Sequence, residues 1–428
     1  MMNASRLAIS AGILSVALGG VSAAPAQVTS TTAPAPGSAL ALQAQAEAKN
    51  RESNYIDLNA GVGYATNPNL FAGGGTDSAF GRISALAVHS VVSNRTSTDL
   101  SAYVENQTYT SNGGSKQVFD LNGRTRYVVN PRFDVFGNVG FSGDIGGQLY
   151  NRFTSVPSAP PPLVVGNPLP PIDLLDPNLI GLNRRQYRLN GQGGFSYKLS
   201  ERDFVNASLG YSRVFFSTGG SALDFGTVTG SLGWDRVLSE RKTVGLRVVS
   251  QRTDYRAGGD STIISPSITG TARLSEGWSL SGAVGLAFVD NNTLGSTERS
   301  TNFTADASLC KSLEAERICA AASRTSQASV GQSVVTATSA SVSYFRNVGS
   351  RDTLQLAANV SRSSGGNSLL VADRSTYYGA NASYNRKLSA RLSAGVEGGV
   401  RRVERSGASV PTDASASIFL RYRLGDVQ

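Results

Sequence analysis

From Asn54 onward, apolar and polar residues alternate along the chain in segments of about ten residues. In the clearest segment one face is apolar or small, with Phe119, Leu121, Gly123, Thr125 and Tyr127. The other face is polar, with Asp120, Asn122, Arg124 and Arg126. Because successive side chains of a strand point to opposite faces of the sheet, this alternation predicts β-strands with one apolar and one wet face.

Near-identical short connections separate pairs of these segments. They return about every 36–39 residues, with one larger gap, as in Leu199–Arg202, Leu238–Arg241 and Leu274–Gly277. This period fits two strands and two connections, which is one hairpin. Longer connections rich in Gly, Ser and Asn alternate with the short ones, as at Asn67–Ser78, Asn291–Arg299 and Ser363–Arg374. Short turns on one side and longer loops on the other are typical of an outer-membrane barrel.

The pattern predicts an all-β fold, a transmembrane antiparallel up-and-down β-barrel of about eighteen strands. The segments are centred near residues 58, 85, 103, 123, 138, 191, 209, 230, 247, 268, 284, 305, 321, 340, 357, 381, 396 and 419. Two of them, at 79–92 and 327–347, are weakly patterned, so sixteen strands is the alternative count.

Composition supports a barrel in lipid. Charged residues are only 16% of the chain, against about 25% in soluble domains. No stretch after the N-terminal segment has the 18 or so apolar residues of a membrane helix, which leaves a closed barrel as the membrane-spanning structure. Several aromatic residues lie close to the short turns, as expected of a girdle at the membrane interface: Tyr197, Trp234, Trp278, Tyr344 and Tyr384.

The first residues resemble an export signal. Arg6 precedes an apolar run from Leu7 to Leu18, and small residues follow with cleavage motifs after Ala23 or Ala26. We therefore expect a signal peptide at 1–26, a periplasmic segment at 27–53 and the barrel at 54–428. The expected location is the outer membrane of a Gram-negative bacterium, where membrane lipid surrounds the barrel.

The final segment, Ser415–Leu424, resembles the C-terminal strand that the barrel-assembly machinery recognises, although Gly425–Gln428 follow it. Over 54–424, pattern, length and turn style resemble the family of proteobacterial β-barrel porins that accompany exopolysaccharide export systems. That resemblance implies a conduit for polysaccharide, acting with periplasmic polysaccharide-export proteins and inner-membrane copolymerase proteins as partners.

The polar face of a wide barrel lines its lumen. The candidate lumen residues are charged side chains on that face: Asp120, Arg124, Arg126, Arg188, Arg247, Arg273, Glu397, Arg401, Arg421 and Arg423. They can guide a charged or hydroxyl-rich solute, and the net charge of +9 favours anions. Alternatively, they brace a solvated wall through cross-strand ion pairs.

One connection is long and unusual. Asp144 to Asn183 contains eight prolines among Leu and Val residues, which is too Pro-rich for a strand. We expect it either to fold into the lumen as a constriction or lid, or to pack over the mouth of the barrel or against a neighbouring subunit.

Cys310 and Cys319 are the only cysteines and flank one short turn, so an oxidising periplasm predicts a disulfide between them. Two cysteines without a nearby histidine do not make a metal site. His89, the only histidine, has no hydrolase motif near it. Arginines are spread over many strands rather than gathered in a nucleic-acid patch. We expect no enzyme activity, no cofactor and no nucleic-acid partner.

The sequence thus predicts an outer-membrane channel, with exopolysaccharide export as its expected role. Two alternatives remain open: a general or anion-preferring diffusion porin, and a structural or adhesive surface barrel.

Overall fold

The computed structural model describes residues 51–68, 70, 77–111, 114–145, 185–217, 223–275, 277–293, 296–313, 315–329, 333–365, 374–405 and 408–426. The expected signal peptide, most of the expected periplasmic segment at 27–53 and most of the long connection after Asp144 lie outside them. No helix among the described residues is long and apolar enough to cross a membrane.

These residues form β-strands, β1 to β19 in chain order. The strands are β1 (Arg51–Ala65), β2 (Ser78–Val92), β3 (Thr96–Tyr109), β4 (Ser115–Asn130), β5 (Phe133–Ile145), β6 (Arg185–Lys198), β7 (Asp203–Phe216), β8 (Phe225–Ser239), β9 (Lys242–Tyr255), β10 (Asp260–Ser275), β11 (Trp278–Thr293), β12 (Ser296–Ser312), β13 (Glu316–Ser329), β14 (Ser333–Val348), β15 (Asp352–Ser364), β16 (Arg374–Lys387), β17 (Leu392–Arg405), β18 (Ala408–Ser409) and β19 (Asp413–Gly425).

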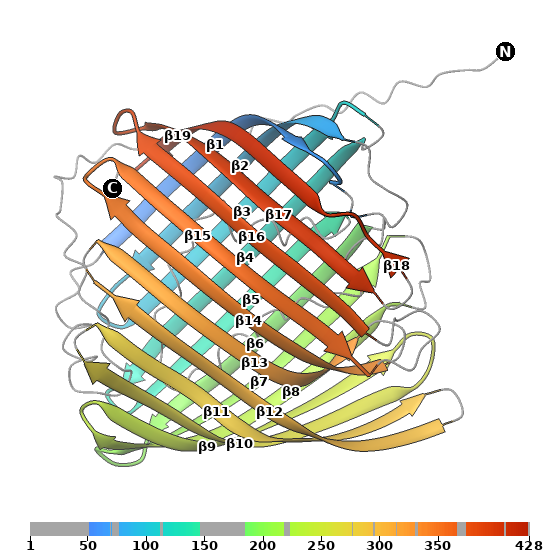
Figure 1. Cartoon of the computed structure of the whole chain (residues 1–428). Coiled ribbons are helices and arrows are strands. Elements are labelled where there is room, and N and C mark those ends of the chain that lie inside the picture. The colour runs from blue at the N-terminus through green and yellow to red at the C-terminus, as the bar shows by residue number, and fades with distance from the viewer. Residues whose placement is uncertain are drawn as a thin grey trace, which may run out of the picture. The chain divides into compact units, whose positions relative to one another are not determined.

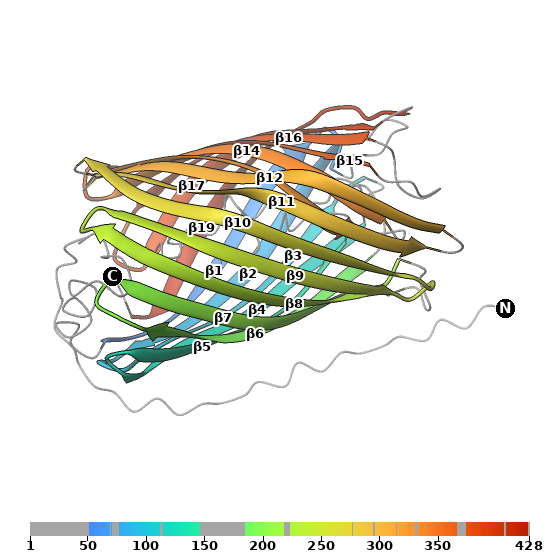
Figure 2. The ribbon, with the colours of Figure 1, turned by 90° about the horizontal axis from the view of Figure 1, so that it is seen from below.

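The sheet closes on itself. Each long strand pairs antiparallel with the next, and β1 pairs with both β2 and β19 (Figures 1 and 2). β18 is a two-residue ladder on β17, so the barrel wall has eighteen strands, the nineteen of the sheet less β18. The predicted fold and the preferred strand count are confirmed, and every predicted centre lies within a strand.

One predicted connection is wrong. The Asn291–Arg299 stretch is not a long loop, because β11 continues to Thr293 and β12 begins at Ser296. Asn291 pairs with Glu298 in that ladder. Polar side chains here do not end the strands, since water at the rim of the barrel can solvate them while the backbone stays paired. The first strand of the barrel, β1, begins at Arg51.

Several of the short turns share one device, a serine at the start of the turn. The backbone N–H groups of Arg202 and Asp203 both donate to Ser200 Oγ, each at 3.1 Å. Ser389 accepts from Arg391 and Leu392 in the same way, at 3.3 and 3.0 Å. Such hydroxyl-to-backbone bonds satisfy N–H groups that the strand ladder leaves free. This explains why the Leu-Ser pair recurs along the sequence.

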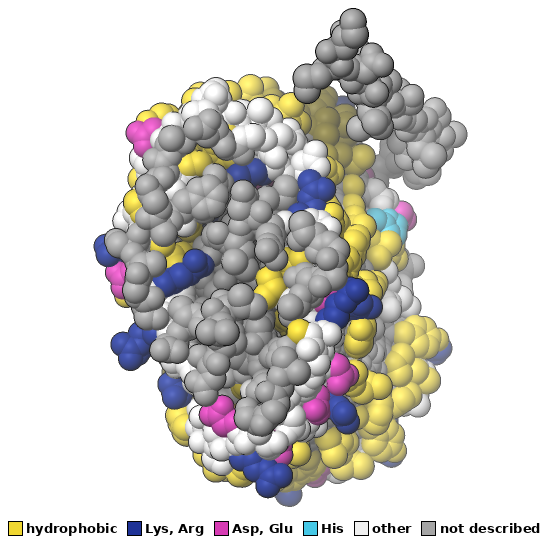
Figure 3. Space-filling model, turned by 90° about the vertical axis from the view of Figure 1, so that its right-hand side faces the viewer, with side chains coloured by type: hydrophobic (Ala, Val, Ile, Leu, Met, Phe, Trp, Pro, Cys, Tyr) yellow, Lys and Arg dark blue, Asp and Glu magenta, His cyan; other side chains and the backbone are white. Residues whose placement is uncertain are grey.

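The outward face is an apolar belt. Leu and Val side chains more than two-fifths exposed lie on it throughout the barrel, for example Leu209, Leu232, Leu246, Val284 and Leu420. Figure 3 shows hydrophobic side chains along the outer wall, and Lys and Arg around the rim at the loop end.

A closed sheet with an apolar exterior is the architecture of an outer-membrane barrel of a Gram-negative bacterium. In such barrels the short turns are periplasmic. β1 begins and β19 ends at the edge that carries the short turns, so both strand termini are periplasmic and the longer loops face outside.

Candidate functional site: the inner wall

The candidate site is the inward face of the barrel. Successive side chains of each strand alternate between this face and the apolar belt on the outside. All ten charged residues singled out from the sequence lie on this face. Their positions follow from the strand register: Asp120, Arg124 and Arg126 on β4, Arg188 on β6, Arg247 on β9, Arg273 on β10, Glu397 and Arg401 on β17, and Arg421 and Arg423 on β19. The inner wall is not uniform, because charge and neutral polar groups occupy different arcs.

One arc, from β6 round to β16, carries mostly hydroxyl and amide side chains. Short hydrogen bonds link these groups across strands. Gln192 Nε2 donates to Ser208 Oγ at 3.0 Å, and Ser208 Oγ in turn lies 2.7 Å from Ser231 Oγ. Similar hydroxyl pairs join Ser281 to Ser308 and Ser323 to Ser339. A wall of this kind offers many neutral donors and acceptors and few fixed charges.

The other arc surrounds the seam where β19 meets β1, and several of its charges form close ion pairs. The Arg423 guanidinium donates two hydrogen bonds to the Asp57 carboxylate, both at 2.7 Å, across the seam itself. Arg423 also lies over the Tyr55 ring, 4.1 Å from its centroid. On the next strand pair, Arg401 Nη2 donates to Asp413 Oδ2 at 2.6 Å. Planar two-point contacts of this kind fix geometry as well as charge.

Arg82 joins the two sides of the seam over a longer reach. It lies on β2, and its Nη1 is 2.6 Å from Glu397 Oε1 on β17, with β1 and β19 between. Its Nε is 4.0 Å from Glu105 Oε2 on β3. The Arg82 side chain is only 7% exposed. One guanidinium therefore connects carboxylates from two strands on opposite sides of the closure.

Glycines beneath this cluster leave room for it. A Cβ on Gly63 would lie 2.5 Å from the Phe80 ring, and a Cβ on Gly395 would lie 2.4 Å from the Phe419 ring. Both rings lie on the inner wall and are buried. Glycine in a strand often marks such a close approach. Here the missing Cβ atoms leave space on the inner wall for the two aromatic rings beside the charged residues.

The structure does not gather all the candidate residues into one place. Arg124 pairs with Asp99 at 2.8 Å and Arg126 with Asp134 at 2.5 Å, on the edge of the charged arc. The remaining basic residues, Arg188, Arg247 and Arg273, lie on separate strands of the neutral arc.

Arg82 and Asp413 belong to the charged arc, and nothing in the sequence singled them out as residues of the lumen. Arg82 lies in the weakly patterned segment. The alternation there is still visible, because one face has Phe80, Arg82 and Ser84 and the other has Ile83, and it could have predicted that Arg82 faces inward. Asp413, which is fully buried, begins the last strand and has no local signal of its own.

The cysteines also lie on the inner wall. Cys310 on β12 and Cys319 on β13 face each other in the register and are joined by a disulfide. The bridge closes the periplasmic turn between those strands. His89 lies elsewhere, on the outward face near the periplasmic rim, and its Nδ1 is 2.5 Å from Asn54 Oδ1.

No protein-family model matches the chain, and no curated protein matches it. Among solved structures, Pseudomonas aeruginosa OccK2 (OpdF) is 11% identical with a TM-score of 0.43, over 88% of this chain and 98% of that one. A BenF-like porin from Pseudomonas fluorescens Pf-5 is 9% identical with a TM-score of 0.43, over 88% and 99%. P. aeruginosa OpdQ is 8% identical with a TM-score of 0.43, over 87% and 98%.

We expect Arg423→Ala to destabilise the barrel by about 2–3 kcal/mol, because it leaves the buried Asp57 carboxylate without its partner. Arg124→Ala is the matched control on the same wall. Its ion pair is more exposed, with Arg124 55% and Asp99 33% exposed, so the loss should stay below about 1 kcal/mol. Urea unfolding in detergent micelles, followed by the fluorescence of Trp234 and Trp278, measures both. Equal losses in the two variants would contradict a special role for the seam pair.

Proposed function

We propose that the barrel is a water-filled channel through the outer membrane for hydrophilic solutes. The observation that carries this proposal is the inner face, which is polar on strand after strand while the outer face is apolar. Barrels of about 16–18 strands are wide enough to leave an aqueous lumen rather than fill with side chains. Charge pairing around the seam leaves the remaining wall free to contact a solute.

Within that function, we propose exopolysaccharide as the exported solute. A sugar polymer presents many hydroxyl groups and few apolar surfaces, and the β6–β16 arc presents matching neutral donors and acceptors, as in the hydroxyl pairs of Ser281 and Ser323. The sequence resemblance to porins that accompany export systems supports the same cargo. The barrel would be a passive conduit, with direction and energy supplied by periplasmic export proteins and an inner-membrane copolymerase.

A diffusion porin with a preference for anions is the second candidate. Arg247 and Arg273 favour it, because they face inward on the otherwise weakly charged arc. Fixed charges on the wall of a pore set its ion selectivity. A porin would conduct without partners, whereas a surface barrel that only binds external ligands would not conduct.

We expect Arg247→Glu to shift the reversal potential of the purified channel toward cation preference, since it reverses a charge on the inner wall. Arg252→Glu is the control. It makes the same charge change on the same strand, but Arg252 lies on the outward face. Planar-bilayer recordings in a salt gradient measure both. If the outward variant shifts the potential as much as the inward one, the ion path does not follow this wall.

We expect deletion of the gene to abolish polysaccharide secretion, while uptake of small solutes is unchanged, and the wild-type gene to restore it. Thr229→Trp with Gln251→Trp narrows the inner wall at a cross-strand pair and should lower secretion. Val228→Trp with Arg252→Trp places the same rings on the adjacent outward pair and should not. Secreted polysaccharide is assayed as total sugar per cell. Normal secretion in the deletion strain would overturn the export role and leave the porin candidate.

A further inference from the structure

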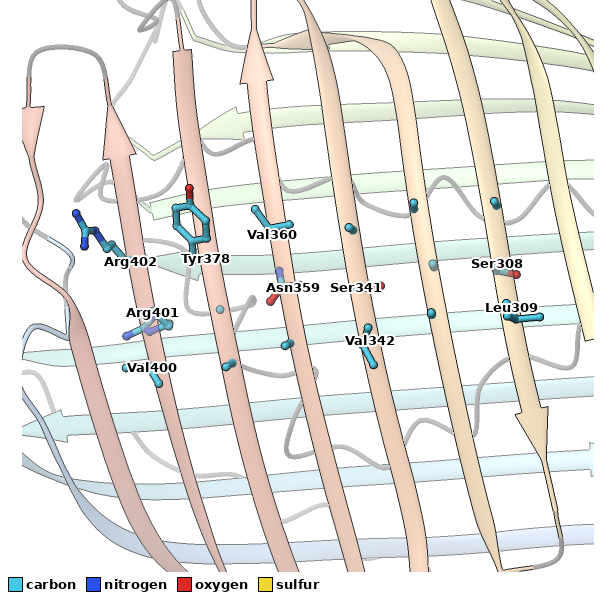
Figure 4. A pocket seen from close by; sticks show the side chains of 18 of the residues that line it. Ser308, Leu309, Ser341, Val342, Asn359, Val360, Tyr378, Val400, Arg401 and Arg402 are labelled. Carbon is cyan, nitrogen blue, oxygen red and sulfur yellow. The ribbon is translucent and has the colours of Figure 1, made fainter. Parts of the chain in front are cut away.

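The outward face carries a groove over β12–β17, with a volume of about 700 Å³. Figure 4 shows Val342, Val360, Tyr378 and Val400 on neighbouring strands of this region, with Arg402 beside Tyr378. Alanines lie on the outward face here, where other parts of the belt have Leu, Ile or Phe: Ala307, Ala320, Ala322, Ala340, Ala358 and Ala380. The lipid-facing wall is therefore hollowed over one sector.

Strand register places a basic row directly beside this groove. The lower groove row runs Ala320–Val342–Ala358–Ala380–Val400, and the next row toward the outside runs Ala322–Ala340–Val360–Tyr378–Arg402. The row after that holds Arg324 and Arg362, one strand to either side of Thr338. Arg374 is diagonal to Arg362, in the pair with Ser364. Apolar and basic surfaces thus follow one another toward the external rim.

Within the described part of the chain, Arg324, Arg362 and Arg374 lack the carboxylates that accompany similar arginines elsewhere. At the periplasmic rim, Arg386 Nε lies 3.8 Å from Asp352 Oδ1, and Arg236 Nη1 lies 3.9 Å from Asp203 Oδ1. At the external rim, Arg324, Arg362 and Arg374 have no carboxylate within ion-pair distance among the described residues.

Two further contacts complete the charge distribution of this sector. Arg324 Nη1 donates to Thr338 Oγ1 at 3.3 Å, and Arg402 pairs with Glu404 at 3.0 Å. Glu404 lies in the same cross-strand row as Arg362, joined to it through Thr376. Among the described residues of this sector, one carboxylate therefore accompanies four guanidinium groups, and their net charge is positive.

We propose that this surface is a specific binding site for a phosphorylated, acylated glycolipid of the outer leaflet, of the lipid A class. Its phosphate would contact Arg324, Arg362 and Arg374, and one acyl chain would occupy the alanine-lined groove. Guanidinium groups bind phosphate through paired, charge-assisted hydrogen bonds.

The position of the site in the membrane favours a glycolipid of the outer leaflet as its ligand. The basic row lies at the end of the strands that carries the longer loops, so it meets the outer leaflet, whose phosphorylated lipid in a Gram-negative outer membrane is a glycolipid. The groove begins one row below the guanidinium groups, which is where acyl chains start beneath a headgroup. A soluble phosphorylated ligand would contact the arginines only, and nothing would fill the apolar groove.

The test is a native mass spectrometry titration of the full-length barrel in detergent with bis-phosphorylated, hexa-acylated lipid A. The test variant combines Arg324→Gln, Arg362→Gln and Arg374→Gln, and we expect it to bind lipid A at least tenfold more weakly, because charge-assisted contacts are lost. The control variant removes the same charge at the periplasmic rim with Arg236→Gln, Arg346→Gln and Arg386→Gln, and should bind like the wild type. Heat-modifiable gel mobility verifies that each variant is folded.

A second variant tests the groove without changing charge. Ala340→Leu with Ala358→Leu fills it, and we expect weaker lipid A binding and unchanged binding of inorganic phosphate. Three results would overturn the proposal: equal losses in the two arginine variants, undiminished binding in the filled groove, or phosphatidylglycerol bound as tightly as lipid A.

Discussion

The structure depends on one constraint, which is that backbone N–H and C=O groups within a bilayer must find partners inside the protein. A sheet meets this constraint only if its first and last strands pair. Here β1 and β19 form a continuous antiparallel ladder from Tyr55 opposite Gly425 to Ala65 opposite Ser415. Asn54 and Asp426 extend it, because Asn54 N donates to Asp426 Oδ2 at 2.6 Å. These contacts join residues at least 350 positions apart, so they form only when the whole chain is in place.

The charged cluster lies where this closure occurs. Arg423 and Asp57 pair across the seam, and Arg82 and Glu397 bridge it from one strand further out on each side. A wrong register between β1 and β19 would separate these partners and leave buried charges unpaired, which is costly. The same alternation that points these groups inward points apolar side chains toward lipid. Closure, the polar lumen and the apolar belt are therefore consequences of one pairing pattern.

Much of this was predictable because the signals are local. Period-2 alternation located the strands, and recurrent Leu-Ser turns located the periplasmic hairpin ends. Cys310 and Cys319 were placed by their symmetric spacing about one turn, and the structure joins them. The error at Asn291–Arg299 has a simple cause, since polar composition indicates exposure to water and a strand at the rim is exposed without ending.

The rest could not be read from local patterns. Arg82 and Glu397 meet only after closure brings β2 near β17, and single-strand alternation contains no such information. The groove has the same origin, because it depends on which alanines of five strands, β12 to β16, come into register. Ala340 is unremarkable within β14 and becomes part of a surface only beside Ala322 and Val360.

In this barrel, inward positions face water and outward positions face lipid. The most direct measurement compares neighbouring positions on β9 in a Cys310→Ser, Cys319→Ser background: Val249→Cys, which faces inward, and Val248→Cys, which faces outward. Nitroxide labels on the refolded protein in lipid vesicles report access to a water-soluble nickel chelate and to oxygen. We expect high nickel access at position 249 and high oxygen access at position 248. Equal access at both positions, or the reverse order, would contradict it.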